Sequence, residues 1–167
     1  MSSNVFSVIE KSIANLRRMH PELPVEWMTV ARMVAQVHLR GRIMAGGMLK
    51  VWDITYPEYS ILVALYGADG YMLPTTSLCE ITGESSSNTK RLVHFLCDRK
   101  LVIRGYDKAD RRKIMVGLSD AGMHLLRRAL PTMAGLLDEQ VRTFESGELP
   151  ELVRLLKKSL KGIMGES

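Results

Sequence analysis

The sequence predicts a mainly α-helical protein with one small β-hairpin, an α+β fold. Apolar residues recur at helical spacing near both ends and through the middle of the chain. Two short β-prone segments, 101–106 and 114–118, enclose the polar segment 107–113. Hydrophobic residues make up 46% of the 167 residues and charged residues 25%, which is typical of a folded globular chain.

Three helices are expected in the first third of the chain. The first covers residues 4–19, and the second runs from about 25 to 44 or beyond, until Gly46-Gly47 ends or bends it. The third begins at Thr55, which has capping-box spacing to Glu58.

The central segment predicts two helices separated by a tight turn. Ser77 and Glu80 have capping-box spacing at the start of a short helix over 78–82, and Gly83 supplies the turn. Any residue of Ser85-Ser86-Ser87 can cap a second helix that runs to about Arg99. This arrangement predicts a helix-turn-helix.

A hairpin and two further helices complete the predicted elements. Ser119-Asp120 caps a helix over 121–144, which can bend near Pro131 or Gly135, and a final amphipathic helix begins near Pro150. We therefore expect three parts: terminal helices over 1–54 and 121–167, and a winged helix-turn-helix domain over 55–120.

The positive charge is concentrated in one segment. The net charge is +5, and residues 85–115 contain nine basic and three acidic residues, a net +6. The other residues contribute 14 basic and 15 acidic groups, a net −1. A localised positive field is what a polyanionic partner requires, although a solvated charged surface would explain the cluster alone equally well.

The residue types in this segment favour DNA as the polyanion. Asn can pair with adenine and Arg with guanine in the major groove, while the hairpin forms a wing whose Arg111 or Arg112 enters a minor groove and whose Lys108 and Lys113 meet phosphates. The predicted DNA-binding residues are Thr75, Ser85, Ser86, Ser87, Asn88, Thr89, Lys90, Arg91, Lys108, Asp110, Arg111, Arg112 and Lys113.

Several motifs in this region resemble the MarR family of bacterial regulators. Arg91-Leu92-Val93, Leu96, Leu101-Val102 and Arg104 follow its recognition-helix pattern, and residues 110–113 match its wing motif. Residues 116–122 match its "LT-x-x-G" pattern, with Ser119 in place of Thr. The resemblance is specific over 57–125 and architectural over 25–56 and 126–164, and the first 20 or so residues look like an extension. Lys100 stands where the family usually has Gly, which predicts strain at a helix C-terminus.

The resemblance implies a homodimer whose terminal helices intertwine and whose two recognition helices meet a pseudo-palindromic DNA site. Apolar stripes at both ends of the chain support mutual burial independently. The family pattern also implies that Asp110 supports the wing by pairing with a nearby Arg. It further implies a repressor released by a small aromatic acid or phenol, with His38, Arg42 and Trp52 as candidate ligand-binding residues.

Other function classes are less well supported. No Ser-His-Asp arrangement, phosphate-binding glycine loop or metal-ligand cluster is visible, so we expect no enzyme, metal or cofactor. Cys79 is expected to pack among apolar helix positions, and neither Cys79 nor Cys97 is expected to sense redox changes. Without a signal peptide or a membrane-spanning apolar run, the expected location is the cytoplasm. The alternative function is a winged-helix adaptor that binds proteins without specific DNA binding.

Overall fold

The structure is a computed structural model that describes residues 5–107, 110 and 112–165. The chain divides into two compact units, Met1–Tyr59 and Ser60–Ser167. Unit 1 contains α1 (Val5–Met19), α2 (Val25–Leu49) and the short 3-10 helix η1 (Lys50–Trp52). Helix α3 (Tyr56–Tyr66) begins in this unit and continues into unit 2.

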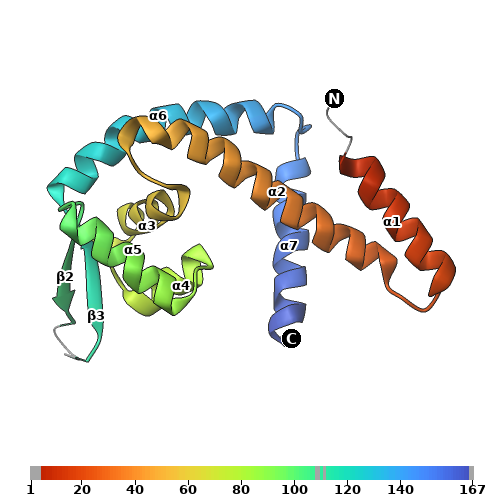
Figure 1. Cartoon of the computed structure of the whole chain (residues 1–167), viewed down its shortest axis with the longest axis horizontal. Helices are drawn as coiled ribbons and strands as arrows, with labels where there is room; N and C mark the ends of the chain where they lie inside the picture. The colour runs from red at the N-terminus through yellow and green to blue at the C-terminus, as the bar shows by residue number, and fades with distance from the viewer. Residues whose placement is uncertain (1–4, 108–109, 111, 166–167) are drawn as a thin grey trace. The chain divides into compact units, whose positions relative to one another are not determined.

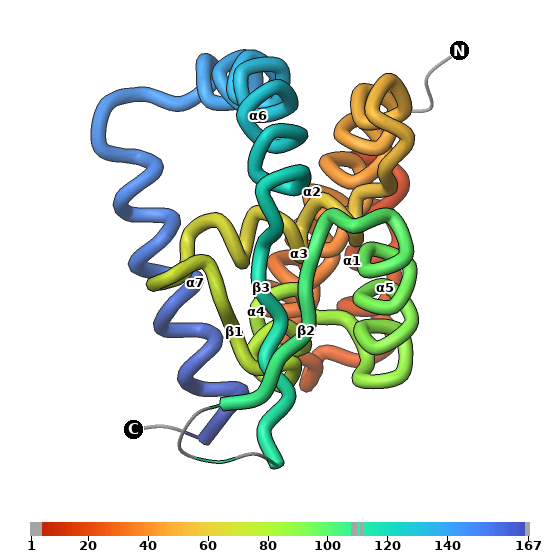
Figure 2. Tube along the Cα trace, turned by 90° about the vertical axis from the view of Figure 1, so that its left-hand side faces the viewer, coloured from red at the N-terminus to blue at the C-terminus, as the bar shows by residue number. Residues whose placement is uncertain are grey.

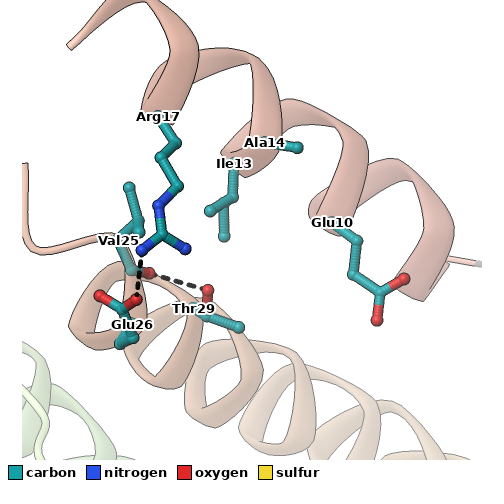
Figure 3. A pocket seen from close by; sticks show the side chains of 7 residues that line it. All are labelled: Glu10, Ile13, Ala14, Arg17, Val25, Glu26 and Thr29. Atoms are coloured by element: carbon teal, nitrogen blue, oxygen red, sulfur yellow. Dashed lines mark hydrogen bonds and ion pairs between the residues drawn. The ribbon is translucent and has the colours of Figure 1, made fainter. Parts of the chain in front are cut away.

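Helix α1 packs along the start of α2 in unit 1. Ile9 is buried, and a cavity of about 270 Å³ lies between the two helices. Figure 3 shows Ile13 and Arg17 of α1 pointing toward α2, where the Arg17 guanidinium pairs with the Glu26 carboxylate at 3.1 Å. The N-terminal extension is therefore a packed helix.

Helix α2 continues through Gly46 and Gly47 to Leu49. Of the two predicted outcomes at these glycines, an end or a bend, the end is therefore wrong. Each glycine costs roughly 1 kcal/mol relative to alanine in a helix. Ala45 and Leu49, one turn apart, are both buried, and their packing offsets this cost.

The predicted capping box at α3 is present in part. The Glu58 carboxylate accepts hydrogen bonds from the Thr55 backbone amide at 2.7 Å and the Thr55 hydroxyl at 2.8 Å. These bonds satisfy the buried Glu58 and fix where α3 begins.

Unit 2 contains the rest of α3 and a winged helix-turn-helix. Its other elements are η2 (Asp69–Tyr71), β1 (Met72–Pro74), α4 (Thr75–Thr82), α5 (Ser86–Asp98), β2 (Val102–Tyr106), β3 (Ile114–Leu118), α6 (Asp120–Val141) and α7 (Glu148–Met164). Figure 1 shows α4 and α5 next to the β2–β3 hairpin. The buried residues of this unit include Leu62, Leu65, Leu78, Leu96, Val116 and Leu126.

The sheet has three antiparallel strands in the order β1-β3-β2, which lie side by side in Figure 2. Strand β1 was not expected from the sequence. It pairs Met72 with Gly117 and Pro74 with Met115. Three residues are too short to show strand alternation, and β1 depends on β3 for its hydrogen bonds.

Strand β1 also changes where α4 begins. The helix follows Pro74 directly, and Ser77 lies inside it, so the predicted Ser77–Glu80 capping box is wrong. The Thr75 hydroxyl donates to the Ile114 carbonyl oxygen of β3 at 3.3 Å. The pairing with β3 therefore fixes the start of α4 two residues before Ser77.

Helix α6 has the predicted cap, because the Ser119 hydroxyl accepts from the Gly122 amide at 3.0 Å. Pro131 lies within this helix. Helix α7 buries none of its residues. In the part of the chain that the structure describes, no helix is both long and apolar enough to cross a bilayer.

Candidate nucleic-acid interface

The helix-turn-helix is formed by α4, a glycine turn and α5. Gly83 has a φ of 69°, a conformation that glycine adopts without steric cost, and its amide donates to the Cys79 carbonyl oxygen at 2.9 Å. The Ser85 hydroxyl then accepts from the Asn88 amide at 3.2 Å. Ser85 is thus the N-cap of α5, as predicted.

Helix α5 has one buried and one exposed face. Its buried residues are Thr89, Leu92, Val93 and Leu96. The opposite face exposes several predicted DNA-binding residues, namely Ser86, Ser87, Lys90 and Arg91, together with His94. Short polar side chains at the start of the helix and cations farther along it suit entry into a DNA groove.

Thr89 is a correction to the predicted interface. Its relative exposure is 0%, so its side chain cannot meet a base or a phosphate. The reason is positional: Thr89 precedes Leu92, Val93 and Leu96 by three, four and seven residues, which places it on the apolar stripe of the helix. The same spacing is visible in the sequence.

The wing is held by local hydrogen bonds around Asp110. The Asp110 carboxylate accepts from the backbone amide and the Nε of Arg112, both at 3.1 Å. These bonds to Arg112 lower the pKa of the Asp110 carboxyl. The expected pairing of Asp110 with a nearby Arg is confirmed, and the predicted contacts Lys108 and Arg111 lie outside the described residues.

Strand β2 connects α5 to the wing. The Arg104 guanidinium donates to the Lys90 carbonyl oxygen at 3.5 Å. Arg104 therefore lies beside the cations of α5, although it was not among the predicted DNA-binding residues.

A groove of about 980 Å³ lies between α4, α5 and the base of the wing. Five basic residues line it, and none of its lining residues within the described chain is acidic. These cations come from α5, β2 and the wing: Lys90, Arg91, Arg104, Arg112 and Lys113. Thr75 and Ser86 also line the groove. The structure thus brings together residues that are up to 40 positions apart in the sequence, from Pro74 to Ile114.

The groove also contains residues that the sequence interpretation did not select. They include His94 and Cys79, besides Thr76 and Ser77. His94 follows Lys90 by four residues, so helical spacing alone could have placed it on the same face. Cys79 was assigned to packing, and its side chain is half-buried at the groove.

Lys100 has a positive φ of 59°, in the left-handed region. The Leu101 amide donates to the Leu96 carbonyl oxygen at 2.9 Å, and the Lys100 amide donates to that of Cys97 at 2.8 Å. These two bonds form a Schellman motif at the end of α5, in which glycine usually occupies the Lys100 position. The predicted strain at this helix end is confirmed.

The predicted ligand-binding residues lie in unit 1. His38 and Arg42 are one turn apart on α2, and Trp52 belongs to η1. His38 is exposed, and the Arg42 guanidinium lies over the Tyr56 ring, 5.7 Å from its centre. Their role in ligand binding stays a prediction. Among the described residues, no group of three or more His, Cys, Asp or Glu side chains could hold a metal ion.

Two characterised relatives are transcriptional regulators. The chain is 22% identical over 157 residues to the transcriptional repressor MprA of Escherichia coli, an alignment that covers 93% of this chain and 88% of MprA. It is 29% identical over 109 residues to the transcriptional regulator HosA of Escherichia coli, covering 65% of this chain and 78% of HosA. No profile of a known protein family matches the chain.

The fold is similar to solved structures of MarR family regulators. AbsC of Streptomyces coelicolor aligns with a TM-score of 0.74 at 21% identity, covering 83% of this chain and 95% of AbsC. Sco3205 of the same organism, solved in complex with DNA, aligns at 0.72 and 20%, covering 84% and 89%. BpsR of Bordetella bronchiseptica, whose DNA binding is regulated by 6-hydroxynicotinic acid, aligns at 0.66 and 21%, covering 78% and 91%.

These similarities agree with the arrangement of the elements described above. The helix-turn-helix, the wing and the long helices that follow it occur in the predicted order. The chain therefore has the winged-helix fold of the MarR family regulators, which its sequence motifs predicted.

Proposed function

We propose that this protein is a homodimeric transcriptional regulator that binds double-stranded DNA through α5 and the wing. The observation that carries the proposal is the groove lined by five cations between α4, α5 and the wing. A concave basic surface attracts the phosphates on both sides of a DNA groove, and binding releases their counterions. The DNA complex of the structurally similar Sco3205 supports the same use of the fold.

In this proposal the exposed face of α5 enters the major groove. Ser86 and Ser87 at the helix start are short enough for close approach, and the free amides there favour a phosphate. Arg91 reads a base edge, and Lys90 contacts a phosphate. Arg112 and Lys113 of the wing contact the neighbouring backbone or minor groove.

The dimer follows from apolar surface that the chain leaves uncovered. Helix α7 exposes a leucine-rich stripe, with relative exposures from 36% at Leu149 to 70% at Ile163. A second seam runs along α2 and into η1 at alternating steps of three and four residues, which is the spacing of a coiled coil. Its members are Trp27, Val30, Val34, Val37, Gly41, Met44, Met48 and Val51.

In a symmetric dimer, a second copy of the chain presents the same apolar stripes, so the two copies bury them against each other. Burying one leucine of α7 contributes roughly 1.5–3 kcal/mol. The two recognition helices of the dimer then meet half-sites about one turn of DNA apart, roughly 34–36 Å.

The regulator is a repressor released by a small aromatic acid or phenol. The name of MprA supports repression, and the regulation of BpsR by 6-hydroxynicotinic acid supports a ligand of this class. His38, Arg42 and Trp52 are the proposed ligand contacts. The ligand must prefer the conformation that does not bind DNA, because equal affinity for both conformations would shift nothing.

A salt series of DNA binding tests the proposal. The purified protein is titrated with the DNA upstream of its own gene, with unrelated duplex as competitor. We expect competitor-resistant binding that weakens steeply with salt. In a plot of log affinity against log salt concentration, Lys90→Ala should reduce the slope by about one, because one phosphate contact is lost. Lys158→Ala, on the polar side of α7, is the matched control and should keep the slope.

Equal and weak binding to both duplexes would contradict the proposal. The winged helix would then be an adaptor for proteins.

A further inference from the structure

Three side chains form a connected row at the start of α5. The Asn88 Nδ2 donates to the Glu84 Oε2 at 2.6 Å. The Arg91 Nη2 and Nε donate to the Asn88 Oδ1 at 2.8 Å and 3.2 Å. Glu84 and Asn88 are half-buried, whereas Arg91 is exposed and lines the basic groove. The row is thus anchored in the protein at one end and open to the groove at the other.

The chemistry of the end groups fixes the orientation of Asn88. A carboxylate only accepts hydrogen bonds and a guanidinium only donates them. The amide nitrogen must therefore face Glu84 and the amide oxygen must face Arg91, as observed. An asparagine is suited to this bridge because one side of its amide donates and the other accepts.

This arrangement leaves Asn88 unable to read adenine. Recognition of adenine requires a free amide oxygen for its N6 amino group and a free amide hydrogen for N7. Both lone pairs of Oδ1 are already used by Arg91. As long as these two hydrogen bonds persist, Asn88 does not form the Asn–adenine pairing expected from the sequence.

Arg91 keeps the donors that guanine needs. A guanidinium has five N–H donors, of which two go to Asn88. The remaining three include both hydrogens of Nη1 and one of Nη2, and this edge matches the O6 and N7 of guanine. A side chain that is already held in place loses less freedom when it binds.

We propose that Asn88 is a positioning residue that, anchored by Glu84, holds Arg91 for recognition of a guanine in each half-site. The inference rests on the proposed function and assigns a role to Glu84, which lies outside the predicted interface. It predicts that specificity at one base depends on two residues that do not touch the DNA.

The test measures the preference for that guanine rather than affinity alone. The wild-type protein selects its site from a random duplex library, and its affinity for that site is compared with its affinity after replacement of each guanine. A bidentate arginine contact should favour one guanine by about 5- to 150-fold. Asn88→Ala should reduce this ratio several-fold and leave thermal unfolding and the affinity for random duplex unchanged.

A charge-neutral double variant separates positioning from direct reading. In Glu84→Gln with Asn88→Asp, the glutamine amide donates to the aspartate, which still accepts from Arg91. The row of hydrogen bonds is rebuilt with the donor at position 84 and the acceptor at position 88. The ratio of affinities for the sites with and without the guanine should therefore match that of the wild type. An Asp at position 88 cannot donate to adenine, so loss of an adenine preference in both variants would overturn the inference.

The outcomes distinguish this inference from the proposed function. If the wild type selects no sequence, the proposed function is wrong. If the wild type selects a site but Asn88→Ala keeps the full preference at every guanine, only the positioning role of Asn88 is refuted. Arg91→Ala is the reference variant, because it removes the guanidinium that contacts the guanine. It should bring the ratio of affinities for the sites with and without that guanine to about one.

Discussion

Replacement of Gly122 by alanine should destabilise the protein, although alanine is the better helix former. Gly122 lies in the first turn of α6, where a Cβ would overlap the Leu101 carbonyl oxygen and come within 2.8 Å of the Leu118 Cδ1. The Leu101 oxygen also accepts from the Ser119 amide at 3.1 Å, and the Ser119 hydroxyl donates to the Lys100 carbonyl oxygen at 2.6 Å. The backbone at 100–101 is therefore fixed and cannot move away easily.

The expected magnitude follows from three contributions. Crowding of this kind costs about 1–3 kcal/mol, and the strained Ser119–Leu101 hydrogen bond costs about 1 kcal/mol more. The higher helix propensity of alanine stabilises the variant by up to about 1 kcal/mol, which offsets part of this cost. The net loss is about 2 kcal/mol, which corresponds to a fall of about 4–8 °C in Tm for a chain of this size.

Thermal unfolding by circular dichroism at one fixed protein concentration measures this change. Gly135→Ala is the matched control, because Gly135 lies in the same helix and a Cβ there has nothing within 4 Å. That variant should gain up to about 1 kcal/mol. A Gly122→Ala protein as stable as the control would refute the close-approach argument.

Three further predictions concern the wing, the end of α5 and the dimer. Lys100→Gly should raise stability by about 1 kcal/mol by relieving the left-handed backbone, and an unchanged or lower Tm would contradict this. The folded pKa of Asp110 lies below its ordinary value of 3.8, so its bonds to Arg112 stabilise the wing above that value and are lost as the pH falls through the folded pKa. A carboxyl NMR titration measures this, and an Asp110 pKa at or above 3.8 would contradict it. Leu156→Glu should give monomers in sedimentation and lose specific DNA binding, whereas Lys158→Glu on the polar side of α7 should stay dimeric.

Local signals allowed most of the winged helix to be predicted from the sequence. Ser85 and Ser119 are caps because their hydroxyls can satisfy free amides three residues later, and this depends only on neighbours in the chain. The β2–β3 hairpin follows from two β-prone segments around a polar turn. The cationic residues that line the groove were mostly identified because charge clusters are visible without a structure.

The errors occurred where distant residues decide the local structure. The start of α4 depends on pairing between Pro74 and Met115, which are 41 positions apart. The continuation of α2 through Gly46-Gly47 depends on the burial of Ala45 and Leu49. The Asn88–Arg91 contact depends on side-chain rotamers, which residue spacing does not determine.

If α5 enters the major groove as proposed, the division of this helix into two faces limits how much DNA sequence the protein can read. Of its thirteen residues, Thr89, Leu92, Val93 and Leu96 are buried in the core. Asn88 is occupied by Glu84 and Arg91, and Ser86 and Ser87 offer only short hydroxyls. Under the proposed function, direct reading of bases is therefore concentrated in Arg91, and we expect the shape and deformability of the DNA between the contacts to supply the rest of the specificity. A selected site should accordingly show one strongly fixed guanine in each half-site, with weaker preferences at base pairs that no side chain touches.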